Sequence, residues 1–311
     1  SVASYTPIPV RHAFTKEMQY YTIEQIADNF SVESHNIWKT CNQPGKEEKE
    51  YCELINAETW TEKGWTAIFR VIRHKLASHK KMFRIATSKG LVDVTDDHSL
   101  LQTNGEEISP KDVIIGTKLM HHPIKLTIES TNHLIRIFQC DLNTDTQLDK
   151  TITYFNNNSY ETISFKMNNN NTYNQILYAK LFHEANLHKY NILFTKTNNN
   201  TLYLTIQKNP NNIIRPESPS SILYKEEIQY DGYVYDLTTD NHHFAAGIGN
   251  LIVHNTDSVF FTFHLTDKET GQKVLGEKAL EVSIEIAQEA THNVSKFLKQ
   301  PHDFEYEKTF M

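Results

Sequence analysis

The sequence predicts a mainly β protein with a small α+β insertion and a C-terminal strand–helix–strand segment. Three observations lead to this prediction. Residues 1–123 and 223–255 contain short runs in which β-branched and aromatic residues alternate with polar ones. Residues 124–222 are interrupted by runs of Asn, which favours turns and is a poor strand former. Residues 256–311 contain one long stretch with helical periodicity.

The first segment is rich in strands. Strands are predicted at 66–73, 82–87 and 91–95, with a turn at Lys89-Gly90 between the last two. A short helix is predicted at 23–28, where Thr22 can cap the helix and Gln25 occupies the reciprocal position of a capping box.

The Asn-rich segment reads as an insertion with short ordered pieces. We expect strands at 151–155 and 162–165, a helix at 173–185, and a hairpin formed by 191–195 and 201–206. Its histidines His183 and His188 do not form a metal-nuclease cluster and are expected on a helix surface.

The segments 223–255 and 256–311 differ in the elements that they predict. Residues 232–238 and 249–255 predict strands, and after them 258–263 and 304–310 flank the long helix. In that helix one face is apolar at 3.6-residue spacing; its members are Leu280, Ile284, Ala287, Val294 and Leu298.

Composition narrows the function classes. The net charge of −7 argues against a general nucleic-acid binder, which usually carries a basic excess. No apolar run reaches the length of a membrane span, and the first residues lack the regions of a signal peptide. The odd number of cysteines, Cys41, Cys52 and Cys140, is typical of reduced thiols in an intracellular protein, and their spacing does not fit a zinc site.

The tripeptide His254-Asn255-Thr256 carries one possible chemistry. An Asn side chain can attack its own backbone carbonyl, form a succinimide and cut the chain, and a neighbouring histidine can deliver the protons that this needs. The hydroxyl of Thr256 can first accept an acyl group. Taken alone, the same three residues are typical of an ordinary turn.

A second pair, Thr95 and His98, lies three residues apart. Within one turn the Thr95 hydroxyl can hold a scissile amide or its oxyanion while His98 protonates the departing nitrogen. The alternative is an Asx-type turn with a surface histidine.

Asp236 stands in an otherwise apolar strand, where an unpaired carboxylate is costly in free energy. It therefore needs a partner or a catalytic role, and the alternative is that the strand lies at the edge of a sheet.

These clusters, with Ser1 at the start, resemble the four splicing blocks of inteins. Residues 1–8, 94–101, 234–248 and 251–256 are similar to the first to the fourth block in order, and residues 62–66 and 71–75 between them also read like inteins of family B DNA polymerases. The resemblance covers 1–123 and 223–255. It divides the chain into the two parts of an intein domain, the insertion at 124–222, and host sequence at 256–311.

The host sequence resembles the palm of a family B DNA polymerase. Thr256-Asp257-Ser258 is similar to the second half of the palm motif Tyr-Gly-Asp-Thr-Asp-Ser. The resemblance implies that Asp257 binds Mg²⁺ in the spliced polymerase, whose partners are DNA and deoxynucleoside triphosphates.

For the intein, the resemblance implies the horseshoe-like Hint fold and four reactions without cofactor. Ser1 undergoes an N-to-O acyl shift with Thr95 and His98 assisting. Thr256 then takes the acyl group, with Asp236 managing the proton. Asn255 cyclises with the help of His254 and His242, to which His243 is the alternative, and the host ester rearranges to a peptide.

Several further expectations follow. Splicing requires an upstream extein as partner, so the chain beginning at Ser1 is expected to perform C-terminal cleavage only. The insertion lacks the paired acidic helices of a homing endonuclease, and it is either a degenerate remnant of one or a plain structural insertion. A polymerase fragment with a splicing-inactive insertion and a hedgehog-like autoprocessing domain are the rival interpretations. A large DNA virus is a plausible source.

Overall fold

The structure, a computed structural model, describes residues 1–33, 37–41, 49–97, 99–124, 162–167, 175–187, 190–207, 218–255, 263, 265–267 and 270–296. The chain divides into two compact units, Ser1–Asn255 and Thr256–Met311.

The described part of the first unit is mainly β, as predicted. In chain order it contains β1 (Val2–Ala3), β2 (Pro7–His12), β3 (Met18–Thr22), α1 (Ile23–Phe30), β4 (Lys39–Cys41), β5 (Lys49–Glu53), β6 (Ala57–Thr61), β7 (Gly64–Lys75), β8 (Met82–Thr87), β9 (Gly90–Thr95), β10 (Ser99–Leu101), β11 (Glu107–Ile108), β12 (Thr162–Lys166), α4 (Gln175–Leu187), β13 (Asn191–Lys196), β14 (Leu202–Gln207), β15 (Ile222–Ile228), β16 (Tyr233–Thr239), β17 (His243–Ala246) and β18 (Leu251–His254).

One large curled sheet dominates this unit. Its strands run in the order β15-β8-β9-β1-β16-β7-β6-β2-β3, with β5 paired to β7 and β4 to β5. The long strand β7 curls the sheet because its first residues pair with β6 and its later residues pair with β16 and β5. The short strand β1 therefore lies deep in the sheet, between β9 and β16.

Most local predictions are confirmed. The strands expected at 66–73, 82–87 and 91–95 are β7, β8 and β9. Helix α1 runs two residues further than expected, to Phe30, and the Thr22 N–H donates to Gln25 Oε1 at 3.1 Å as the capping box requires. The strands expected at 151–155 and 304–310, and most of that at 258–263, lie outside the described residues.

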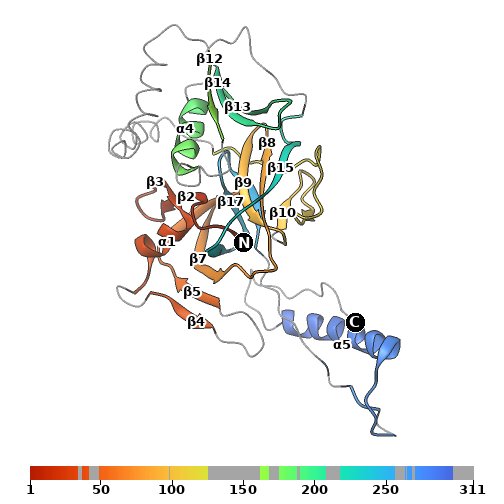
Figure 1. Ribbon diagram of the computed structural model, residues 1–311. Helices are drawn as coiled ribbons and strands as arrows, with labels where there is room; N and C mark the ends of the chain where they lie inside the picture. Colours follow the sequence, from red (N-terminus) through yellow and green to blue (C-terminus); the bar gives the residue numbers. More distant parts are fainter. Residues whose placement is uncertain are drawn as a thin grey trace. The chain divides into compact units, whose positions relative to one another are not determined.

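The described part of the insertion is a small α+β layer within the first unit. Strands β12, β14 and β13 form a three-stranded sheet, and Figure 1 shows α4 beside it, at the same end of the unit. Phe182 and Phe194 share an apolar cluster with Tyr20 and Leu91 of the large sheet and with Ile248, which forms an isolated bridge with Leu91. The described part of the insertion therefore packs onto the large sheet.

The expectation that His183 lies on a helix surface is wrong. His183 is only 7% exposed, its Nε2 has no hydrogen-bond partner, and its ring meets the Tyr20 ring edge to face at 5.8 Å. Helix α4 turns this side chain toward the large sheet, a contact that helical periodicity alone could not locate. His188 lies outside the described residues.

Burial of His183 makes the stability of the first unit sensitive to acid. Burial lowers the pKa of His183 from 6.5 to about 4, so only the unfolded chain takes up a proton between these values. The free energy of unfolding is thus unaffected above about pH 6.5 and falls toward pH 4, by about 1–2 kcal/mol between pH 7.5 and pH 5 from this group. A His183→Met variant should lose less stability over that interval in urea titrations.

The exposed His79 provides the control. A His79→Met variant should show the same dependence on pH as the unmodified chain. Equal losses of unfolding free energy in His183→Met and the unmodified chain would contradict the assignment of His183 as a buried neutral side chain.

The second unit is described mainly through one helix. Helix α5 (Gly276–Ser295) contains four of the five expected apolar positions, and Leu298 lies outside the described residues. Among the described helices of either unit, none has the length and apolar composition that crossing a bilayer would demand.

Candidate splice site at the two chain junctions

The register of β1 fixes the position of Ser1. Val2 pairs with Val94 of β9 on one side and with Tyr235 of β16 on the other, both antiparallel. In antiparallel pairing the preceding residue of one strand lies opposite the following residue of its partner. Ser1 therefore falls between Thr95 and Asp236.

The side chains make the contacts that this register allows. The Ser1 hydroxyl donates to Asp236 Oδ2 at 2.6 Å, a short charge-assisted hydrogen bond. The Ser1 nitrogen lies 3.1 Å from Thr95 Oγ1, and the Thr95 N–H donates to the Ser1 carbonyl at 2.9 Å. The side chains of Ser1 and Asp236 are 8% and 14% exposed, so little water competes for these contacts.

The electrostatics of this junction reflect its burial. Burial lowers the pKa of the terminal amine of Ser1, and the nearby Asp236 carboxylate acts in the opposite direction. Burial also raises the pKa of Asp97, but the Lys80 ammonium at 2.6 Å, the charge at Ser1 and the Thr95 hydroxyl outweigh it and bring the value to about 2. These interactions hold Asp97 and Thr95, the last residue of β9, in place beside Ser1.

The second junction lies at the end of the β17–β18 hairpin. The Asn255 N–H donates to the His242 carbonyl at 2.7 Å, and Asn255 Nδ2 donates to the Leu237 carbonyl at 2.9 Å. Because a carbonyl can only accept, this contact fixes which end of the carboxamide is the nitrogen. Asn255 is 6% exposed. His242 has a φ of 57°, an uncommon conformation for a side chain of this size that turns its carbonyl toward Asn255.

Two glycines allow the hairpin to approach the large sheet. At Gly247 (φ 75°) a Cβ would lie 2.1 Å from the Leu91 carbonyl oxygen, and at Gly249 (φ 81°) it would lie 2.0 Å from that of Lys89. Ile248 between them exchanges two backbone hydrogen bonds with Leu91, each of 2.9 Å. The hairpin that ends at Asn255 is thereby fixed against β9, the strand that ends at Thr95.

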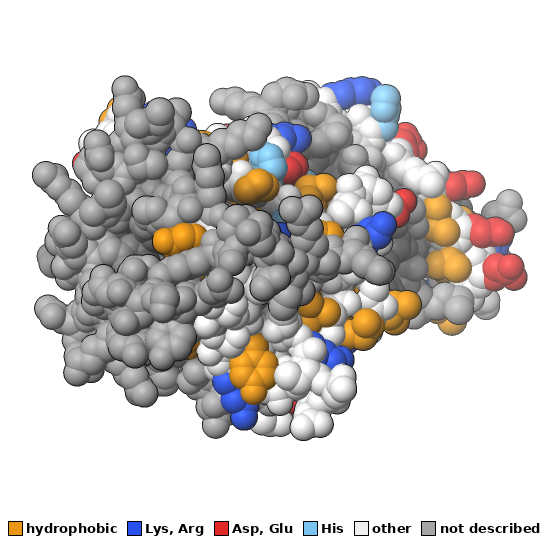
Figure 2. All heavy atoms as spheres, turned by 90° about the horizontal axis from the view of Figure 1, so that it is seen from above, with side chains coloured by type: hydrophobic (Ala, Val, Ile, Leu, Met, Phe, Trp, Pro, Cys, Tyr) orange, Lys and Arg blue, Asp and Glu red, His pale blue; other side chains and the backbone are white. Residues whose placement is uncertain are grey.

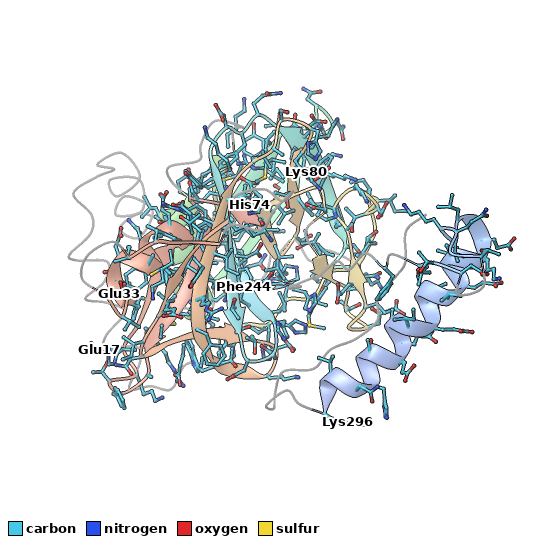
Figure 3. All side chains as sticks on the ribbon, turned by 90° about the horizontal axis from the view of Figure 1, so that it is seen from below. Glu17, Glu33, His74, Lys80, Phe244 and Lys296 are labelled. Atoms are coloured by element: carbon cyan, nitrogen blue, oxygen red, sulfur yellow. The ribbon has the colours of Figure 1, made fainter. Side chains whose placement is uncertain are left out.

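Both junctions are anchored on the same strand. Ser1 contacts the side chain of Asp236, and Asn255 contacts the backbone carbonyl of the next residue, Leu237. Consecutive strand residues are about 3.4 Å apart. The fully buried Phe244, labelled inside the first unit in Figure 3, packs the hairpin into the main core. Residues 254 positions apart in sequence therefore meet at one site.

Two carboxylates that the sequence analysis did not single out lie beside the histidines. Glu62 Oε1 lies 2.8 Å from His243 Nδ1, and Glu107 Oε1 lies 3.0 Å from His254 Nδ1. Burial raises the pKa of Glu62, but the hydrogen bond with His243 and nearby charges lower it overall. Glu62 belongs to a segment that resembles inteins in the sequence analysis, whereas Glu107, the first residue of β11, lies outside every such segment.

His98, Thr256 and Asp257 lie outside the described residues, although the neighbour Ser99 pairs with His254 across β10 and β18. Of the three cysteines, Cys52 is described as a free thiol. Within the described ranges, no three His, Cys, Asp or Glu side chains gather into a metal-binding group.

The amino-acid sequence is similar to those of DNA polymerases and of a translation initiation factor. It is 27% identical over 412 aligned residues to a DNA polymerase of Acanthamoeba polyphaga mimivirus, covering 99% of this chain and 23% of the polymerase. It is 52% identical over 50 residues to a DNA polymerase of Thermococcus hydrothermalis, covering 15% of this chain and 3% of that protein. A probable translation initiation factor IF-2 of Pyrococcus abyssi is 40% identical over 77 residues, 24% of this chain and 8% of the factor. The chain thus spans less than a quarter of each of these relatives.

The similar solved structures are inteins. The transcription factor IIB Mvu mini-intein aligns with 82% of this chain and 100% of its own at 18% identity, with a TM-score of 0.40. The Pab PolII intein aligns over the same shares at 15% identity, with a TM-score of 0.38. No protein-family model matches the chain.

The predicted intein-type fold and polymerase context are confirmed. The curled β-sheet brings Ser1 and Asn255 onto one strand, in a chain that is similar to a DNA polymerase along nearly its whole length, and both findings agree with the expected intein of a DNA polymerase.

Proposed function

We propose that the chain performs autocatalytic protein splicing and so restores a family B DNA-directed DNA polymerase. One observation carries the proposal: the Ser1 hydroxyl and the Asn255 carboxamide are held at consecutive residues of β16. Oriented intramolecular attack of this kind can lower a barrier by roughly 7–11 kcal/mol. The described site contains the hydroxyl, carboxamide, carboxylate and imidazole groups that the chemistry requires, and we propose that splicing uses no cofactor.

In the first step, Ser1 Oγ attacks the carbonyl carbon that precedes it. The C–O bond forms, the C–N bond to Ser1 breaks, and the hydroxyl proton passes to Asp236 Oδ2, its hydrogen-bond partner. In a precursor the Ser1 nitrogen is a peptide nitrogen, and Thr95 Oγ1 at 3.1 Å is placed to hold it. His98 supplies the proton to the departing amine.

In the second step, Thr256 Oγ attacks the new ester and takes over the acyl group, releasing Ser1 Oγ. Asp236 returns its proton to the Ser1 oxygen, and the proton of Thr256 moves to the carboxylate.

In the third step, Asn255 Nδ2 attacks its own carbonyl carbon, the peptide bond to residue 256 breaks, and a proton passes to the nitrogen of that residue. His254 and His242 assist this transfer, with His243 as the alternative. The hydrogen bond from Asn255 Nδ2 to the Leu237 carbonyl holds the nucleophile in place beforehand. The ester between the host segments then rearranges to a peptide without help from the intein.

The host properties belong to the spliced product. We propose that Asp257 helps to bind Mg²⁺ there and that DNA and deoxynucleoside triphosphates are its partners, as the polymerase relatives suggest. On the face drawn in Figure 2, the described Lys and Arg side chains stand apart rather than gathering into one basic patch. The matches to polymerases of mimivirus and Pyramimonas orientalis virus support a viral source.

A ligation assay tests the proposal. A reporter domain is joined ahead of Ser1, the protein is incubated near neutral pH, and mass spectrometry follows the products. We expect the reporter to become joined to the segment after residue 255, with residues 1–255 released. A Ser1→Ala variant should lose ligation while it still releases the segment after Asn255.

Two outcomes would contradict splicing. An intact precursor would favour a polymerase fragment with an inactive insertion. Transfer of the reporter to an added nucleophile, with no ligation and no cut after Asn255, would favour hedgehog-like autoprocessing.

A further inference from the structure

We propose that Glu107 is a positioning residue for the C-terminal cleavage, an inference that rests on the proposed function. Glu107 belongs to none of the motifs that resemble splicing blocks. It reaches the junction because β11 pairs with β10 and β10 pairs with β18, the strand that ends at His254. Its carboxylate oxygen Oε1 lies 3.0 Å from His254 Nδ1, and that histidine side chain is 12% exposed.

The position of the carboxylate selects one form of the imidazole. A neutral histidine carries its proton on one ring nitrogen, and the partner of the other nitrogen decides which. A carboxylate facing Nδ1 favours the proton there, because only an N–H can donate to it. The lone pair is then on Nε2, and His254 presents a single defined nitrogen for proton transfer to or from Asn255 and the residue after it.

Other contacts hold the ring of His254 in place. His243 pairs with His254 across β17 and β18, and the two rings meet edge to face with centroids 5.1 Å apart. Glu62 Oε1 lies 2.8 Å from His243 Nδ1 and also accepts from Asn241 Nδ2 at 3.2 Å. The His242 ring also meets the His254 ring edge to face, with centroids 6.3 Å apart. A fixed His243 ring thus limits rotation of His254 and leaves Glu107 to set its proton position.

In this structure the Glu107–His254 contact has the distance of an ion pair but is not aligned as a hydrogen bond. Glu107 is 46% exposed, so its side chain can rotate to align with the ring nitrogen without disturbing the core. Catalytic hydrogen bonds are often misaligned before the reacting geometry is reached. We therefore place the contribution of Glu107 in the cyclisation step rather than in folding.

The kinetic test compares Glu107→Ala, Glu107→Gln and the full unmodified chain. We expect Glu107→Ala to slow release of the segment after Asn255 by about tenfold or more, a share of the roughly 10²–10⁴-fold that a positioned acid–base group supplies. Glu107→Gln should recover much of the rate, because its amide oxygen can still accept from Nδ1–H. Glu106→Ala is the matched control, since Glu106 directly precedes Glu107 in the chain and accepts from Asn104 instead; its rate should not change.

A spectroscopic test separates positioning from a structural role. In the full chain carrying Asn255→Ala, which prevents cleavage, ¹⁵N spectra of the histidines should show His254 protonated on Nδ1, and Glu107→Ala should shift it toward the other tautomer. Unchanged cleavage rates or an unchanged tautomer in Glu107→Ala would overturn the role of Glu107. Failure of the unmodified chain to cut after Asn255 would instead overturn the proposed function.

Discussion

Replacing Asn255 with Ala is expected to stop release of the segment that follows it. Asn255 Nδ2 is the attacking atom in the proposed cyclisation, and its hydrogen bond to the Leu237 carbonyl holds it in place beforehand. Removal of a nucleophile commonly lowers a rate by roughly a thousandfold or more. Denaturing gel electrophoresis and mass spectrometry of the incubated chain measure the released segment over time.

The control for this prediction is Asn29→Ala. Asn29 is an exposed asparagine whose Nδ2 donates to the Gln25 carbonyl within α1, far in sequence from either junction. Its variant should release the segment at the unmodified rate. Release at similar rates from Asn255→Ala and the unmodified chain would show that a different bond-breaking chemistry, or a contaminating protease, is at work.

Replacing Arg84 with Met is expected to lower the free energy of unfolding of the first unit by about 3–5 kcal/mol, the usual cost of leaving one buried charge without its partner. Arg84 and Asp93 are 1% and 0% exposed and form two hydrogen bonds, of 2.8 and 2.7 Å. Asp93 Oδ2 also accepts from Tyr5 and from Gln175 of the insertion, both at 2.8 Å. Loss of Arg84 therefore weakens contacts between the insertion, the turn that follows β1, and β9 together.

Urea unfolding at neutral pH measures this effect. The double variant Arg84→Met/Asp93→Leu serves as the control, because removing both charges avoids an uncompensated carboxylate. It should be more stable than the single variant. A single variant that is as stable as the unmodified chain would contradict the structural role of this pair.

The strands near the two junctions could be predicted from the sequence, because alternation of residue types and turn residues are local features of the chain. The alternation in β8 and β9 and the intervening turn predict the hairpin, and the observed register then pairs Arg84 with Asp93. A buried ion pair could have been inferred from two opposite charges at facing positions. Arg84 and Asp93 were missed because each was judged within its own strand.

Contacts between distant segments were not predictable in this way. Glu107 reaches His254 only through two successive strand pairings, and no spacing in the sequence encodes that arrangement. The burial of His183 likewise depends on where α4 docks on the large sheet. The convergence of Ser1 and Asp236 was expected only from a family resemblance, and the register of β1 now supplies its physical cause.

The chemical state of the released residues 1–255 tests the central claim most directly. The full chain is incubated near neutral pH, quenched in acid to preserve the new terminus, and weighed by mass spectrometry. Cyclisation of Asn255 predicts a fragment lighter by one water molecule than the hydrolysed form, ending in a succinimide. A fragment of the hydrolysed mass from the earliest time point, with a free carboxyl at Asn255, would contradict it.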